Sequence, residues 1–295
     1  MSRRRFYSPP EDIGDATVIL STDETHHLTH VLRLTPGSPA FVFDGCGREY
    51  ECTFRGITDN RARLEISEAL SNVVESPLHL TLAQALAKGD KFDLIIQKAT
   101  ELGVSRIVPL MTRYADVKLE EQMITRRLER WRRISLEALK QCGRRRLVEI
   151  TIPCTLPQLL ELGAPANVTQ AASDNVAQAA ILRTEENVAQ AAGLRIDSSK
   201  TPALKPAAGA TFLLFSERGG VAITQALEGI PKPASIVALI GPEGGWSDDE
   251  FDLLDRHGAK SVSLGARVLR TETAAVVAIT LIQHLTGDLS VRGNE

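Results

Sequence analysis

The stretch Ile236-Val237-Ala238-Leu239-Ile240-Gly241-Pro242-Glu243-Gly244-Gly245 leads a run of β-forming residues directly into a glycine-rich loop. The run predicts a buried strand, and open α/β sheets bind ligands at the carboxyl ends of their strands. Glycines let a backbone approach a ligand closely, and Pro242 stiffens the turn. Ser247, with Glu250 three residues later, predicts a capping box that begins a helix over about Asp248 to Arg256. The stretch therefore favours an α/β domain with a ligand-binding loop.

Two more loops of this kind fall in the same fifty-residue window. Leu264-Gly265 follows a short predicted strand, and Leu269 to Ala274 begins an Ala/Val/Ile-rich helix. We expect Thr271 to be the N-cap of that helix and Glu272 to complement its positive end. The three loops match neither the G-x-G-x-x-G fingerprint nor a P-loop, which argues against a nicotinamide-dependent oxidoreductase and against nucleoside-triphosphate binding.

The rest of the chain predicts two domains. Residues 1–73 show short strands, one helix over about 24–32 and a hairpin turn at Asp59-Asn60, a pattern typical of a small β-barrel. Residues 74–295 alternate strands with helices, as in a parallel α/β sheet. Residues 163–208 break this alternation with a repeated, Ala-, Gln- and Asn-rich sequence, and we expect a surface insertion there.

Composition limits the class of protein. The chain has 295 residues, 43% apolar and 24% charged, which is ordinary for a globular protein. It shows neither a secretory signal nor an apolar run long enough to span a bilayer, so we expect a cytoplasmic protein. Its four cysteines lack zinc-site spacing and are expected to be reduced and mostly buried. His26, His27 and His30 are expected on a helix surface, and no metal is expected.

The distribution of charge matters more than the net charge of -3. Between Arg126 and Arg146, nine basic side chains stand against two glutamates. The segment Arg144 to Arg146 follows Gly143, where the helix should stop, and we expect it either to contact phosphates or to form a solvated face. Acidic residues outnumber basic ones in the first 73 positions, so RNA contacts there would need Arg3, Arg4, Arg5 and Arg33.

The combined motifs resemble those of SPOUT-class methyltransferases, and more narrowly the 16S rRNA N3-methyluridine methyltransferase (RsmE) family. The resemblance covers nearly the whole chain except 163–208. It rests on the three loops and on further matching pieces in both domains: His27, Val31 to Leu34, Lys88-Gly89-Asp90, Gln97 to Val104, Trp131, Glu137-Ala138 and Gln141.

The resemblance implies a PUA-like barrel followed by an α/β domain tied in a deep trefoil knot. It also implies a homodimer that uses S-adenosylmethionine as cofactor and 16S rRNA of the small ribosomal subunit as partner. The residues that it assigns to the cofactor site are Leu214, Ser216, Glu217, Ile240, Gly241, Pro242, Glu243, Gly244, Gly245, Leu264, Gly265, Val268, Leu269, Arg270, Thr271 and Thr273.

Chemistry at uridine N3 requires removal of a weakly acidic proton, which leaves negative charge on the base. Arg270 is our candidate for stabilising that charge, with phosphate binding or pairing with Glu272 as its alternative roles. The general base stays open between Glu217 and Glu272. Two other hypotheses remain: a SPOUT enzyme that modifies a ribose 2′-hydroxyl or a guanine, and a non-catalytic RNA-binding factor in ribosome assembly.

Overall fold

The computed structural model describes residues 4–70, 75–115, 121–162, 210–230 and 235–289, which form two compact units. One unit contains the described part of Met1–Glu75 together with Leu136–Leu147, and the other contains the remainder. The last turns of a helix that begins in the second unit therefore belong to the first. The predicted first domain, residues 1–73, therefore lacks Leu136–Leu147, which the structure adds to it. The expected insertion at 163–208 lies outside the described residues.

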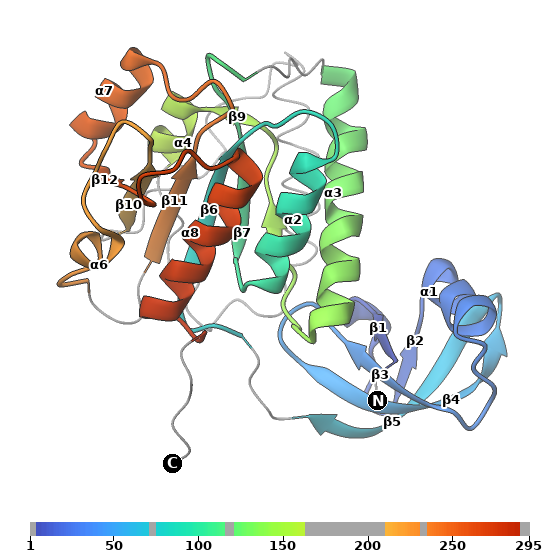
Figure 1. Ribbon diagram of the computed structural model, residues 1–295. Helices are drawn as coiled ribbons and strands as arrows, with labels where there is room; N and C mark the ends of the chain where they lie inside the picture. Colours follow the sequence, from blue (N-terminus) through green and yellow to red (C-terminus); the bar gives the residue numbers. More distant parts are fainter. Residues whose placement is uncertain (1–3, 71–74, 116–120, 163–209, 231–234, 290–295) are drawn as a thin grey trace, which may run out of the picture. The chain divides into compact units, whose positions relative to one another are not determined.

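The first unit is a five-stranded sheet with the order β1-β3-β4-β5-β2 (Figure 1). Its strands are β1 (Arg5–Tyr7), β2 (Thr17–Ile19), β3 (Pro39–Phe43), β4 (Glu49–Thr58) and β5 (Arg61–Leu70). Asp59 and Asn60 both adopt positive φ between β4 and β5, which confirms the predicted hairpin. Helix α1 (Thr22–His26) continues into a turn of π-helix (His27–Val31), slightly earlier than expected.

Side chains that alternate along these strands, such as Phe6, Val18, Val42 and Leu64, make the barrel core, and Leu28 of the helical segment joins them. Of the three histidines, His26 and His30 are exposed and stack with ring centroids 4.5 Å apart. The cysteines are less buried than predicted. Cys52 and Cys154 are buried, which raises their thiol pKa values to about 12 and about 11, but Cys142 is exposed.

The second unit contains a parallel sheet with the order β12-β10-β11-β6-β7-β8, with β9 also paired to β7. Parallel strands buried on both faces need apolar runs, and Leu80 to Ala85 and Ile236 to Ile240 supply them. The bounds are β6 (His79–Ala85), β7 (Arg106–Met111), β8 (Glu149–Ile150), β9 (Cys154–Thr155), β10 (Thr211–Phe215), β11 (Ser235–Ile240) and β12 (Lys260–Val262).

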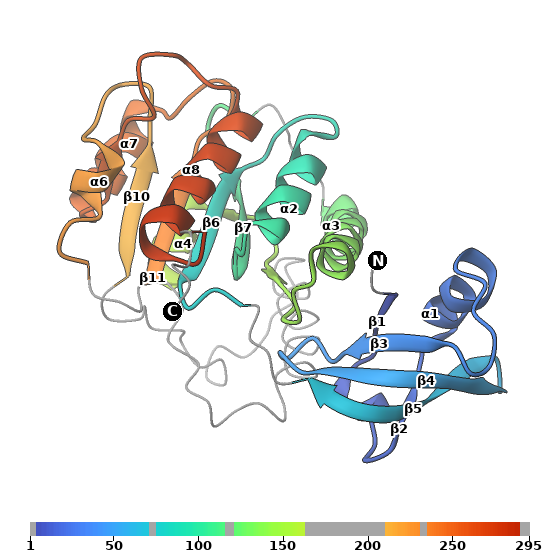
Figure 2. The ribbon, with the colours of Figure 1, turned by 60° about the horizontal axis from the view of Figure 1, so that its bottom comes forward.

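Helices cover both faces of this sheet, as Figures 1 and 2 show. One face carries α2 (Lys91–Glu101), the first part of α3 (Glu121–Cys142), α6 (Ile223–Ala226) and α8 (Thr271–Thr286), and the other carries α4 (Leu156–Leu162) and α7 (Asp248–Arg256). The capping box of Ser247 and Glu250 at the start of α7 is confirmed, and α3 ends before Gly143, which has φ +90°. No described helix is long and apolar enough to cross a membrane.

The connection between β12 and α8 brings the last motif back to the middle of the sheet. Strand β12 lies at the sheet edge, whereas α8 packs against β11 and β6. Residues 263–270 must therefore pass the ends of β10 and β11. The trefoil knot implied by the resemblance stays a prediction.

Candidate functional site

The carboxyl ends of β10, β11 and β12 place three groups of predicted site residues at one edge of the parallel sheet. Ser216 and Glu217 follow β10, Gly241 to Gly245 follow β11, and Leu264-Gly265 follow β12. Because the strands are parallel and adjacent, these loops converge although up to fifty residues separate them in sequence.

A chain of hydrogen bonds joins the strand ends to the start of α8. The Gln84 Nε2 donates to the Thr271 Oγ1 at 2.9 Å, and the Thr271 Oγ1 donates to the Gly241 carbonyl at 2.7 Å. The N-cap of α8 is Arg270, so the prediction that Thr271 caps the helix was wrong. Thr271 is instead the first helical residue, and its buried hydroxyl connects the glycine loop to β6.

The loop needs glycines because neighbouring residues lie too close to it to leave room for a Cβ. A Cβ at Gly241 would lie 2.9 Å from the Trp246 Nε1, and one at Gly244 would lie 2.9 Å from the Tyr114 Cβ. Gly245 has φ +73°, and a Cβ there would lie 3.0 Å from the Glu217 Oε1. The loop is therefore held tightly against its neighbours and exposes backbone at the sheet edge.

Several buried polar atoms at this edge lack a hydrogen-bond partner among the described residues. They are the Gln84 Oε1 at the end of β6, the Thr112 Oγ1 just after β7, the Trp246 Nε1 after the glycine loop and the Glu272 Oε2 in the first turn of α8. Unpaired buried polar groups are costly and uncommon, and here they gather around the motif loops. They provide two donors and three acceptors for a polar ligand, since a hydroxyl can act in either role.

Charged side chains of both signs flank the loop. The Lys91 Nζ, at the start of α2, donates to the Glu243 Oε1 at 2.8 Å, and this hydrogen bond raises the pKa of Lys91. Glu272 and Arg270 also act electrostatically on Lys91, so all four lie close together. Arg270 is exposed, and its guanidinium makes no hydrogen bond or ion pair with another described residue. The alternative in which it pairs with Glu272 is therefore not observed.

The other predicted site residues divide by burial. Three of them are buried beneath the loop surface: Leu214, Ile240 and Pro242. Leu264 and Leu269 are half-buried. The remaining exposed members are Gly265, Val268, which is 78% exposed, and Thr273. Sequence reasoning missed Gln84, Lys91, Tyr114 and Trp246. A polar residue inside an apolar strand was the available signal for Gln84, and the position directly after the glycine loop was the signal for Trp246.

Comparison with known proteins identifies the family to which this chain belongs. A family model described as an RNA methyltransferase domain matches residues 74–196 and 194–283, and one described as an RNA methyltransferase PUA domain matches residues 20–67. The chain is 34% identical to the ribosomal RNA small subunit methyltransferase E of Synechocystis over 95% of its length and 77% of that protein. The chain belongs to the ribosomal RNA small subunit methyltransferase E family.

Solved structures of similar proteins agree with this assignment. The methyltransferase E of Neisseria gonorrhoeae, bound to S-adenosyl methionine, is 28% identical and superposes with a TM-score of 0.75 over 98% of this chain and all of that one. A putative methyltransferase of Legionella pneumophila, in complex with bound SAM, is 29% identical, with a TM-score of 0.74 and the same coverage. The N-terminal unit of this methyltransferase is thus the PUA-like domain, and its parallel α/β unit is the methyltransferase domain.

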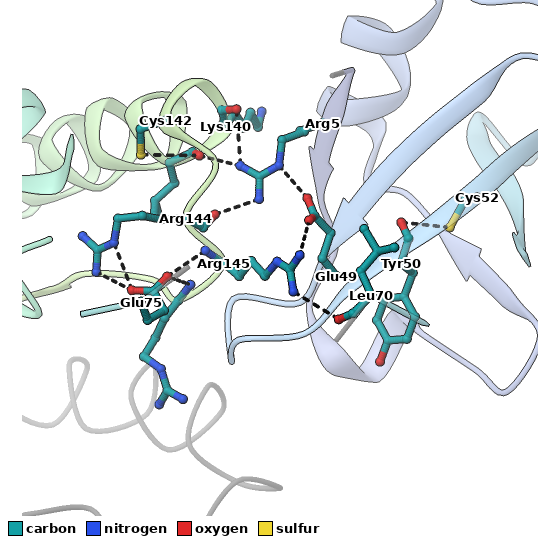
Figure 3. A network of polar contacts seen from close by, with 12 residues as sticks. Arg5, Glu49, Tyr50, Cys52, Leu70, Glu75, Lys140, Cys142, Arg144 and Arg145 are labelled. Carbon is teal, nitrogen blue, oxygen red and sulfur yellow. Dashed lines mark hydrogen bonds and ion pairs between the residues drawn. The ribbon is translucent and has the colours of Figure 1, made fainter. Parts of the chain in front are cut away.

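Three of the arginines predicted to bind RNA are buried inside the PUA-like unit of the methyltransferase (Figure 3). The Arg5 Nε and the Arg145 guanidinium bind the two oxygens of Glu49 at 2.6 and 2.8 Å, and all three side chains are less than 5% exposed. Arg144 pairs with Glu75 at 2.9 Å. The prediction of phosphate contacts is therefore wrong for Arg5, Arg144 and Arg145, because these side chains are buried and the carboxylates of Glu49 and Glu75 already pair with their guanidinium groups.

The backbone at the end of α3 completes this network. Arg5 donates to the carbonyls of Leu139 and Arg144 at 2.6 and 2.8 Å, and the Glu75 Oε1 accepts from the amides of Arg145 and Arg146. Arg5 thus supplies the positive charge that a helix C-terminus favours. Among the other candidates, Arg4, Arg33 and Arg146 are exposed, and Arg3 lies outside the described residues.

Proposed function

We propose that this protein transfers a methyl group from S-adenosylmethionine to N3 of a uridine in the 16S rRNA of the small ribosomal subunit. The observation that carries the proposal is the Gln84–Thr271–Gly241 hydrogen-bond chain, which assembles the motif loops into one site. The name of the relatives supports small-subunit ribosomal RNA as the substrate. The S-adenosylmethionine bound in two similar structures supports this cofactor as the methyl donor.

The residues at the sheet edge fit this cofactor. The Gly241 to Gly245 loop presents its backbone at the sheet edge, where a flat adenine ring can lie against it, with Leu214, Ile240 and Leu264 nearby as apolar support. The unpartnered Gln84, Thr112 and Trp246 atoms supply hydrogen-bonding groups for ribose hydroxyls, ring nitrogens and the amino-acid part. When bound, the cofactor supplies an electrophilic methyl group on a sulfonium.

The chain itself must orient the uridine and handle the N3 proton. We assign Arg270 to the charge that develops on the uracil carbonyl oxygens, because its guanidinium is exposed and has no carboxylate partner among the described residues. Glu272 is the better placed of the two candidate bases, since its Oε2 is buried without a partner whereas Glu217 is exposed. Lys91, close to both Arg270 and Glu272, adds a further positive charge where the uridine would lie.

The RNA-binding proposal now rests on Arg4, Arg33 and Arg146, together with Arg3. The described three are exposed, and Arg33 lies at the end of the helical segment of the PUA-like unit. We expect these side chains to contact phosphates and to set the position of the RNA without reading its sequence. We also propose a homodimer, which sedimentation would test, and action in the cytoplasm, where small-subunit RNA is found.

Primer extension across small-subunit rRNA tests the reaction directly. Because N3 lies on the Watson–Crick edge, its methylation stops reverse transcriptase. RNA from cells lacking this protein should lose one stop, and purified protein with S-adenosylmethionine should restore it. A full set of stops in the deletion strain would reject uridine N3 as the target. Failure to bind S-adenosylmethionine in calorimetry would favour a non-catalytic RNA-binding factor.

A further inference from the structure

Tyr114 stands out among the aromatic residues of this chain. All thirteen Phe, Tyr and Trp residues lie in the described parts, and Tyr114, at 48%, is the only one with an exposed side chain. It follows β7 by three residues, at the same sheet edge as the motif loops. An exposed aromatic face at this edge is a surface on which a flat base can stack.

The backbone of Tyr114 is fixed against the methyltransferase site. Its Cβ would lie 2.9 Å, and its carbonyl oxygen 3.3 Å, from a Cβ at Gly244. The preceding residue, Arg113, donates its amide to the Glu250 Oε1 and its guanidinium to Asp249, both at 2.9 Å. The backbone around Tyr114 is thus held by α7 and the glycine loop, while Tyr114 itself stays 48% exposed.

We propose that the Tyr114 ring stacks on the target base and holds it beside the methyl donor. This inference rests on the proposed function. A uridine that reacts at N3 must leave its helix or stack, which costs a few kcal/mol. An aromatic face replaces part of the lost stacking without touching the Watson–Crick edge, so N3 stays free to face the site. Packing against Gly244 alone would need only the Cβ of Tyr114, not an exposed ring.

Kinetics of two substitutions test this role. Tyr114→Phe keeps the aromatic face, and Tyr114→Leu keeps the Cβ contact with Gly244 but removes the face. We expect kcat/KM for RNA to fall about tenfold to hundredfold in Tyr114→Leu and to stay near wild type in Tyr114→Phe. S-adenosylmethionine affinity should be unchanged in both, and Val221→Ala, another exposed apolar position, should leave every value unchanged.

An RNA fragment with an abasic site at the modified uridine supplies a second, binding-based measurement. Base removal should weaken RNA binding by wild type but change little in Tyr114→Leu, because the two deletions remove the same contact. Additive losses, or equal kcat/KM for active wild type and Tyr114→Leu, would overturn the stacking role. An altered sedimentation coefficient in Tyr114→Leu would also overturn it, by placing the ring between copies. Absence of methylation by wild type would instead reject the proposed function.

Discussion

The Thr271 hydroxyl donates a 2.7 Å hydrogen bond to the backbone carbonyl of Gly241, thirty residues earlier in the chain. The same oxygen accepts a hydrogen bond from the Gln84 amide, and both side chains are buried. Two motifs that are separate in sequence are therefore parts of one rigid arrangement at the ends of β6 and β11. This arrangement fixes the direction in which α8 leaves the site, with Arg270 immediately before it.

Replacement of Thr271 by Val tests how far the site depends on this hydroxyl. The substitution removes the hydrogen bonds to the Gly241 carbonyl and from the Gln84 amide, which keeps only its bond to the Ala85 carbonyl, so the free energy of unfolding should fall by about 1–3 kcal/mol. S-adenosylmethionine affinity should fall as well. Thr280→Val is the matched control, because the Thr280 hydroxyl bonds only to the Val276 carbonyl within α8. Urea denaturation and calorimetry measure both effects, and equal losses in the two variants would contradict a linking role.

The buried Glu49 carboxylate should be a main determinant of the stability of the PUA-like unit. Glu49→Gln leaves Arg5 and Arg145 without their counter-charge, and we expect a loss of about 3–5 kcal/mol in urea denaturation. Glu65→Gln on β5 is the control. Its pair with Arg55 is more than half exposed on each side and should contribute at most about 1 kcal/mol. A similar loss in both variants would show that burial does not strengthen the Glu49 contacts.

Arg33 and Arg146 should contribute to RNA affinity rather than to stability. Replacement of either by Ala should lower the magnitude of the slope of log affinity against log salt by about 0.7–0.9 and leave the unfolding midpoint unchanged. Filter binding at several salt concentrations measures the slope. Arg55→Ala, which removes an exposed but ion-paired arginine of the same unit, is the control. Unchanged slopes in Arg33→Ala and Arg146→Ala would remove both residues from the interface.

Arg270 should act on turnover and not on cofactor binding. Because one preorganised donor to developing negative charge is worth about a hundredfold in kcat, Arg270→Ala should lose about that much. Arg270→Lys should recover part of it, and S-adenosylmethionine affinity should stay unchanged in both. Arg267→Ala changes the net charge of the same exposed loop and serves as control. Full turnover in Arg270→Ala would exclude the charge-stabilising role.

The sequence by itself determined the elements and the loops of the candidate site. The β-forming run before Gly241, the Asp59-Asn60 turn, the Ser247–Glu250 capping box and the glycines after Ile240 are local signals, and the structure has each of them where it was predicted. Local signals suffice there because capping, turn geometry and strand burial depend on residues a few positions apart.

Long-range partners were decided only by the tertiary structure. Thr271 looked like an N-cap because helix starts favour threonine, yet its hydroxyl bonds to Gly241 rather than to its own helix. Arg144 to Arg146 looked like one basic patch, but the fold places Glu49 and Glu75 beside two of them and leaves Arg146 exposed. The acidic excess of the first 73 residues and the arginine run after α3 partly neutralise each other. Charge counts along a chain cannot show this, because they do not say which charges meet in the folded protein.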